Sequence, residues 1–167
     1  MRKRFVDLHV RIGPADLATS ASWIKALGID VMGPTSDGRS ASIEVSTALD
    51  SLRAEGVEAY LRLDVDPARR GMSLRGLTAW KDEFQVLAGA ITSMRGLRAL
   101  LGSSIDLLFA DTPHSRLLGP HSFRSIAKAG KPFEVNLRPL LVTRGVQRTY
   151  ALTELSRQVR LAAEARV

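Results

Sequence analysis

Arginine is the residue type in this chain with the most chemistry to offer. Of the 24 lysine and arginine residues 19 are arginines, and the net charge is +7. The planar guanidinium presents its donors in a fork that matches phosphate oxygens. Ten arginines stand at the ends of predicted strands or at the starts of the segments that follow: Arg11, Arg62, Arg69, Arg70, Arg95, Arg98, Arg116, Arg138, Arg144 and Arg148. This placement predicts a basic rim that binds phosphates, with a merely solubilising surface as the alternative.

Acidic residues and histidines form the second group with possible chemistry. Asp7, His9 and Arg11 alternate along the first predicted strand, so their side chains share one face. This pattern resembles the opening Asp-x-His-x-His motif of the polymerase and histidinol phosphatase (PHP) family of metal-dependent phosphoesterases, with Arg11 in place of the second histidine. Because a guanidinium repels a metal ion rather than ligating it, and only His114 and His121 remain, we expect no metal site.

Several other kinds of catalytic site are excluded by the sequence. The chain has no cysteine, which rules out disulfides, thiolate catalysis and iron–sulfur ligation. It has no P-loop, no dinucleotide-binding glycine motif after a strand and no serine nucleophile elbow. Aromatic residues make up 5% of the chain, which argues against a base-stacking platform. Glu58, Asp64 and Asp111 remain candidates for acid–base roles in a small-molecule barrel enzyme.

The elements that must position these residues follow a regular order. Short apolar runs alternate with amphipathic segments, which is typical of repeated βα units. Strands are predicted at residues 5–10, 29–33, 57–65, 85–91, 105–110 and 132–137. Helices are predicted at residues 15–27, 42–55, 73–83, 94–101, 121–129 and 147–166. Gly28, Gly56 and Gly130 predict the ends of three helices, because glycine enters the left-handed region without a steric penalty.

The faces of the predicted strands distinguish a barrel from an open sheet. In residues 57–65, apolar side chains alternate with Glu58, Tyr60, Arg62 and Asp64. Strands of an open sheet covered on both sides are apolar on both faces. The pattern therefore predicts an α/β fold, an incomplete TIM-like (β/α) barrel with about six βα units. Charged residues inside it either neutralise one another or, for arginines near the strand ends, serve a site: Asp7, Arg11, Arg62, Glu134 and Arg138.

The chain is expected to form one domain over residues 1–167, because no linker or low-complexity segment divides it. Charged residues interrupt any apolar run near the start, and no stretch approaches the roughly 18 apolar residues of a membrane span. We expect a cytoplasmic protein without a membrane partner. An eight-unit barrel needs about 250 residues, so we expect an open side between the first and sixth strands that a partner or self-association covers.

One segment carries a specific family resemblance. Residues 136–141 (Asn-Leu-Arg-Pro-Leu-Leu), followed by Arg148 on a long amphipathic helix, resemble the family of ribonuclease P protein component 3, the archaeal relative of the eukaryotic thirty-kilodalton subunit. The strand at 105–109, the helix that ends near Gly130 and the first strand also look like that family. The family is related to the PHP phosphoesterases and lacks their metals, which agrees with Arg11.

The resemblance implies a barrel-like subunit of an endoribonuclease that removes 5′ leaders from precursor tRNA. Its implied partners are the ribonuclease P RNA, another small protein subunit and precursor tRNA. Because the RNA performs the reaction with its own magnesium ions, no catalytic residue and no protein-bound cofactor are expected. The expected RNA-binding residues are Arg11, Arg62, Arg95, Arg98, Arg116, Arg138, Arg144 and Arg148. Arg138 either presents its fork to a phosphate or holds a carboxylate. The alternatives are a metal-dependent PHP-type phosphoesterase and a small-molecule barrel enzyme.

Overall fold

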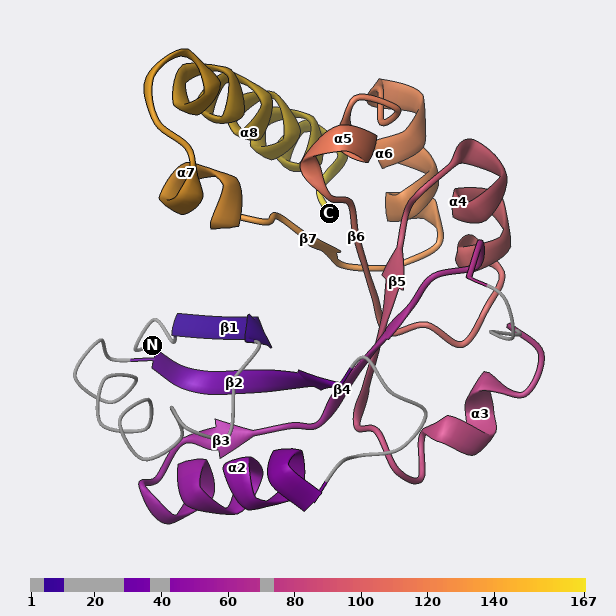
Figure 1. Cartoon of the computed structure of the whole chain (residues 1–167). Helices are drawn as coiled ribbons and strands as arrows, with labels where there is room; N and C mark the ends of the chain where they lie inside the picture. Colours follow the sequence, from indigo (N-terminus) through magenta and orange to yellow (C-terminus); the bar gives the residue numbers. More distant parts are fainter. Residues whose placement is uncertain (1–4, 11–28, 37–42, 70–73) are drawn as a thin grey trace. The chain divides into compact units, whose positions relative to one another are not determined.

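The computed structural model describes residues 5–10, 29–36, 43–69 and 74–167, and Figure 1 shows their helices and strands. The chain consists of two compact units, Met1–Asp64 with Thr78–Leu87 and Val65–Leu77 with Ala88–Val167. We call them the first unit and the second unit. Both combine parallel strands with helices, so the expected α/β class is confirmed. The incomplete TIM-like barrel and the organisation as one domain stay predictions.

The first unit is built around strand β2 (Ile29–Ser36). It pairs in parallel with β1 (Phe5–Val10) and β3 (Glu58–Ala59), and its last residues pair with β4 (Arg62–Val65). Helix α2 (Ile43–Ala54) contributes the buried residues Leu49 and Leu52. Just after α2, Gly56 has a φ of +80°, which confirms the predicted glycine stop. The prediction of the first strand at residues 5–10 is also confirmed.

The predicted strand 57–65 is divided in the structure into β3 and β4. The backbone N–H of Leu61 donates to the Gln85 side chain at 2.8 Å, and its carbonyl accepts from the N–H of Val86 at 3.1 Å. The backbone between the two strands is thus satisfied partly by a side chain, which interrupts the ladder. The predicted alternation survives the break, since Val57, Ala59, Leu61, Leu63 and Val65 are all buried.

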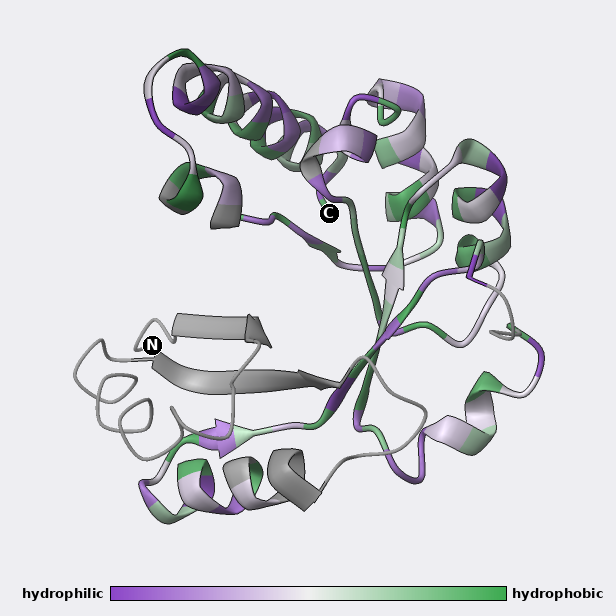
Figure 2. Cartoon of the chain, viewed as in Figure 1, coloured by the Kyte–Doolittle hydropathy of each residue, from purple (hydrophilic) through white to green (hydrophobic). Residues whose placement is uncertain are grey.

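The second unit contains three short parallel strands. β6 (Leu107–Phe109) pairs with β5 (Val86–Ala90), whose last three residues belong to this unit, and with β7 (Phe133–Glu134). β6 is buried throughout, and Figure 2 shows it as an apolar segment. A strand in the middle of a parallel sheet needs apolar side chains on both faces. The predicted strands 105–110 and 132–137 contain β6 and β7, but each prediction extends beyond the observed strand at both ends.

The helices of the second unit are largely those predicted. α4 (Met94–Leu101) matches its prediction and begins at Ser93, whose hydroxyl accepts from the N–H of Gly96 at 3.0 Å. α6 (Pro120–Lys128) ends just before Gly130, which has a φ of +65°. α8 (Gly145–Ala165) packs its stripe of Ala151, Glu154, Gln158, Leu161 and Ala162 inward. It lies against α6 and two shorter helices described next (Figure 1).

The sequence interpretation was wrong about three short segments. α5 (Thr112–Ser115) is a helix where it placed a loop, and α7 (Arg138–Val142) is a helix where it predicted no element between the strand 132–137 and the helix 147–166. Each has a proline in its first turn, where the missing N–H has no intrahelical partner to lose. The third segment is the predicted helix 73–83, of whose described residues only α3 (Leu77–Trp80) is helical. The ring of Trp80, the last residue of α3, packs against Phe84 with ring centroids 6.0 Å apart.

An ion pair with a buried carboxylate and a partly exposed guanidinium holds α5 against α8. The Arg157 guanidinium contacts the Glu154 carboxylate at 2.6 Å, and the hydroxyl of Ser115 donates to the same carboxylate at 2.9 Å. Arg157 also donates to the backbone carbonyls of Ser115 at 2.9 Å and Leu118 at 2.7 Å. The hydrogen bond from Arg157 lowers the pKa of Glu154 although burial opposes the shift. The Ser115 carbonyl, which also accepts from the N–H of Leu118 at 3.0 Å, and the Leu118 carbonyl beyond the helix are therefore both tied to α8.

Gly89 provides a test of the packing between β5 and α4. A Cβ atom at this position would lie 2.9 Å from side-chain atoms of Leu100 and Leu108. We expect Gly89→Ala to lower the free energy of unfolding by about 1–3 kcal/mol, because the core must be displaced. The matched control is Gly102→Ala, where the added methyl meets nothing within 4 Å. Equal losses in urea unfolding for both variants would contradict this account of the core.

The Glu154 pair gives stability a defined dependence on pH. Because the folded pKa of Glu154 is lowered below its ordinary value of 4.5, the pair stabilises the fold above that pH and loses its contribution as the carboxylate is protonated at lower pH. We expect Glu154→Gln to cost about 1–3 kcal/mol at pH 7, with the difference from wild type shrinking as pH falls below 4.5. A difference that is constant from pH 7 to pH 3 in chemical unfolding would argue against the pair.

Candidate nucleic-acid interface

Five of the predicted RNA-binding arginines lie in the second unit with exposed side chains: Arg95, Arg98, Arg116, Arg144 and Arg148. Arg138 is the first residue of α7, and the structure does not describe its side chain. Arg11 lies outside the described residues altogether. The arrangement of the five arginines therefore decides what kind of surface the second unit offers to an anion.

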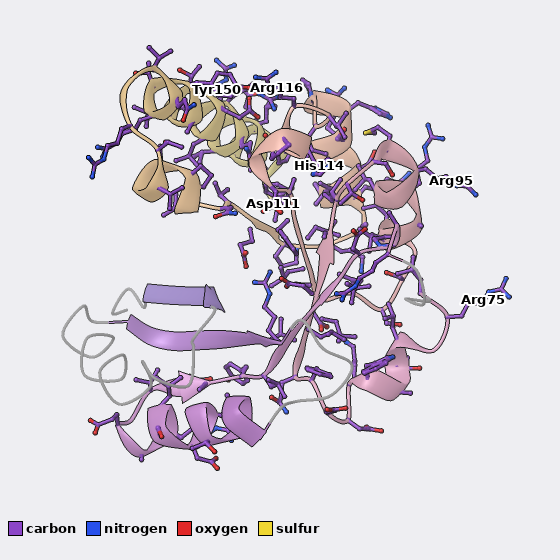
Figure 3. All side chains as sticks on the ribbon, viewed as in Figure 1. Arg75, Arg95, Asp111, His114, Arg116 and Tyr150 are labelled. Atoms are coloured by element: carbon purple, nitrogen blue, oxygen red, sulfur yellow. The ribbon has the colours of Figure 1, made fainter. Side chains whose placement is uncertain are left out.

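Two of these arginines belong to α4. Arg95 follows the buried strand β5 after a short connection, and Arg98 lies one turn further along the helix. The opposite side of α4 is held in the core by Gly96, Leu97 and Leu100. This amphipathic division directs the guanidinium groups to water, and Figure 3 shows Arg95 extending away from the ribbon. Such side chains attract phosphates by charge without fixing their position.

Two more arginines stand at the beginning of α8. Arg144 occupies the N-cap position with an extended backbone, and Arg148 lies one turn into the helix. Both side chains are exposed, and the first turn of α8 contains no acidic residue. The unpaired N–H groups at a helix start add partial positive charge, which reinforces the two guanidinium groups. This end of α8 is thus strongly electropositive.

Arg116 is the arginine with the best-defined geometry. It follows α5 directly, and its guanidinium carbon lies 4.5 Å from the centre of the Tyr150 ring on α8. Its Nε–H group also donates to the Tyr150 hydroxyl. Figure 3 shows the two side chains together where α5 meets α8, in a different part of the second unit from Arg95. The arginines of the second unit are therefore spread over its surface rather than gathered at one point.

Arg62 has a different environment from the other predicted residues. Its side chain is fully buried in the first unit, and its Nε–H group donates to the carboxylate of Asp64 at 2.7 Å. A buried charge needs such a partner, and removing either member leaves an uncompensated charge. The alternative interpretation expected Arg62 to be neutralised together with Asp7, Glu134 and Arg138, whereas the partner that the structure shows is Asp64. The prediction that Arg62 contacts a phosphate gains no support, because its side chain is not accessible to solvent.

The carboxyl ends of the strands in the second unit carry polar side chains. Asp111 follows β6 and Asn136 follows β7, and the amide of Asn136 donates to the Asp111 carboxylate at 3.1 Å. Thr92, after β5, donates to Asp66 at 3.1 Å. Carboxyl ends of parallel strands meet at one edge of a sheet, where α/β proteins commonly bind ligands. At this edge the carboxylates of Asp66 and Asp111 accept hydrogen bonds from neighbouring side chains.

The other two carboxylates proposed for acid–base chemistry are also engaged. Glu58 accepts from the hydroxyl of Tyr60, and Asp64 pairs with Arg62. Both residues belong to the first unit, whereas Asp111 belongs to the second. Each of the three carboxylates therefore has a hydrogen-bond or ion-pair partner within its own unit.

The described residues contain neither a cluster of metal ligands nor a membrane-spanning helix. No group of three or more histidine, aspartate and glutamate side chains arranged to hold a metal ion occurs among them. The structure does not describe the side chains of Asp7 and His9, so the absence of a metal site at that motif stays a prediction. No helix in the described ranges is long and apolar enough to cross a membrane.

Tyr150 and Arg75 were missed by the sequence interpretation. Tyr150 stands four residues before Glu154 and eight before Gln158, which places it on the stripe of α8 that faces the protein. That spacing was a usable signal, but the low aromatic content directed attention away from single aromatic residues. Arg75 precedes α3 and is exposed, and Figure 3 shows it projecting from the ribbon. No feature of its local sequence distinguishes it from other surface arginines.

Comparison with known proteins gives a fold and no family. No protein-family model and no curated protein matches the chain. Among solved structures, the chain is similar to one in a cryo-EM structure of archaeal ribonuclease P with mature tRNA, at 12% identity and a TM-score of 0.77 over 99% of this chain and 71% of that chain. It also has a weaker likeness to a mandelate racemase/muconate lactonizing protein from Herpetosiphon aurantiacus, at 17% identity and a TM-score of 0.44 over 98% and 45% of the two chains. The first likeness shows that the chain shares its fold with a protein chain found in archaeal ribonuclease P.

Proposed function

We propose that this chain is a non-catalytic protein subunit of ribonuclease P that supports the catalytic RNA in removing 5′ leaders from precursor tRNA. The observation that carries the proposal is the similarity in fold, over 99% of the chain, to a chain of archaeal ribonuclease P. The segment 136–141, which resembles component 3 of that enzyme, points the same way. The fold proposed with this function is the incomplete TIM-like barrel, and the proposed location is the cytoplasm.

The charge of the chain suits such a role. An RNA that cleaves a phosphodiester with its own magnesium ions needs neutralisation of its backbone and a fixed fold from its protein subunits. The net charge of +7 and the five exposed arginines of the second unit provide positive charge for this purpose. None of these functions requires a nucleophile or a metal ligand from the protein.

A second protein subunit is part of the proposal. Three apolar side chains are exposed from the start of α7 to the start of α8. Leu137 at the N-cap of α7 is 57% exposed, Val142 at the end of α7 67% and Val146 in α8 86%. Apolar side chains in adjacent segments are typical of surfaces that another protein covers. These residues support a protein partner, and the arginines support an RNA partner.

Reconstitution of the enzyme tests the proposed function. We expect that adding the chain, with its partner subunits, to the ribonuclease P RNA of the same organism lowers the magnesium concentration needed for cleavage of precursor tRNA. The expected cause is protein charge that takes over part of the neutralisation of RNA phosphates. The measurement is the cleavage rate as a function of magnesium, with and without this chain. An identical magnesium profile in both mixtures would refute the proposal.

Removal of exposed arginines tests the RNA interface. We expect the triple variant Arg95→Ala, Arg116→Ala, Arg144→Ala to stay folded, because all three side chains are exposed. Each lost phosphate contact lowers the slope of log affinity against log salt by roughly 0.7–0.9, so the three together should lower it by roughly two to three. The measurement is RNA affinity by filter binding over a range of salt concentrations.

A matched control separates the interface from general charge. The variant Arg124→Ala, Arg160→Ala, Arg166→Ala removes the same number of charges from other exposed positions. We expect the slope of this control to change by less than about one. Arg62 is left intact in both variants because removing a buried charge destabilises the fold. Equal losses of slope in the two triple variants would mean that the predicted arginines form no particular interface.

A further inference from the structure

Arg116 and Tyr150 form an exposed pair that links the end of α5 to α8. The guanidinium carbon lies 4.5 Å from the centre of the Tyr150 ring, and the Nε–H group donates to the Tyr150 hydroxyl. Ring contact and hydrogen bond together restrain both the position and the plane of the guanidinium. The pair is open to solvent, since Arg116 is exposed and Tyr150 is 40% exposed.

The surroundings leave the charge of Arg116 available. The nearby carboxylate of Glu154 is occupied by Arg157 and by the hydroxyl of Ser115. Among the described residues, Tyr150 is the side-chain partner of Arg116, and no carboxylate pairs with it. A guanidinium has five N–H donors, of which Tyr150 takes one at Nε. The two terminal nitrogens therefore remain to bind an anion in the forked manner.

We propose that Tyr150 is a positioning residue that holds Arg116 as a preformed fork for a phosphate of the RNA backbone. This inference rests on the proposed function. A free arginine loses considerable rotamer freedom when it binds, whereas a restrained one has lost much of it beforehand. The guanidinium already covers one face of the ring, so Tyr150 acts through Arg116 rather than by stacking on a base. Arg144 and Arg148, exposed on the first turns of the same helix, favour an RNA over an acidic protein surface.

A double-mutant cycle tests the coupling between the two residues. We expect Arg116→Ala to weaken binding of the ribonuclease P RNA about tenfold and to lower the salt slope by roughly 0.7–0.9. Tyr150→Ala should weaken binding about three- to fivefold when Arg116 is present, the value of an exposed cation–π contact. In the Arg116→Ala background, Tyr150→Ala should weaken binding by less than about 1.5-fold, because nothing is left to position.

Two conservative variants separate charge from geometry. Arg116→Lys keeps the charge but loses the Nε–H donor and the fork, so we expect a nearly unchanged salt slope with an affinity about threefold lower. Tyr150→Phe keeps the ring and loses the hydroxyl, so we expect about a twofold loss. The control is Arg160→Ala, which removes another exposed guanidinium, paired with Glu164 on α8, and should leave affinity within about twofold of wild type.

The outcomes distinguish this inference from the proposed function. If wild type binds the RNA and Arg116→Ala behaves like Arg160→Ala, the phosphate site is refuted while the role in ribonuclease P stands. Equal losses from Tyr150→Ala with and without Arg116 would refute the positioning role, because the ring would then contact RNA itself or act through folding. Thermal unfolding of each variant identifies the latter. Loss of binding to another protein subunit, with RNA affinity intact, would also refute the site. Absence of any RNA binding by wild type would remove the proposed function itself.

Discussion

The ion pair between Glu154 and Arg157 is the interaction on which the described surface of the second unit most depends. The carboxylate is 8% exposed and accepts from both Arg157 and Ser115, while Arg157 reaches two backbone carbonyls at and beyond the end of α5. A helix of four residues has almost no stability of its own. Its position, and hence the position of Arg116 directly after it, is set by the neighbouring helix. The exposed chemistry of this region is thus set by an ion pair whose carboxylate is buried and whose guanidinium is partly exposed.

The elements that sequence reasoning placed correctly are those with strong local signals. α4 has an N-cap serine and a clear apolar stripe, and the ends of α2 and α6 are marked by Gly56 and Gly130. The elements that it missed are decided by contacts from elsewhere in the chain. The break at Leu61 depends on the side chain of Gln85, 24 residues away, which no pattern within residues 57–65 could reveal. α5 is held by Arg157, 42 residues beyond Ser115.

The candidate site shows the same division. Composition and spacing identified exposed arginines at segment boundaries, and Arg95, Arg98, Arg116, Arg144 and Arg148 are exposed. The pattern did not separate them from Arg62, because alternation in a strand assigns a face without telling whether that face meets water. Nor did it pair Arg116 with Tyr150, since residues 34 positions apart meet only through the packing of α5 on α8. Charge was predictable from the sequence, whereas the restraint on that charge was not.

The close approach at Gly89 has a consequence for how this protein can vary among its homologues. Leu100 on α4 and Leu108 on β6 both occupy the space that a side chain at position 89 would need. A homologue that carries alanine or a larger residue there must therefore carry a smaller residue at position 100 or 108, or its helix must move outward. Substitutions at these three positions are expected to co-vary, because the volume that they share is fixed. The same volume is shared by a strand, a helix and the next strand, so a larger residue at position 89 is expected to be tolerated best together with a second change at position 100 or 108.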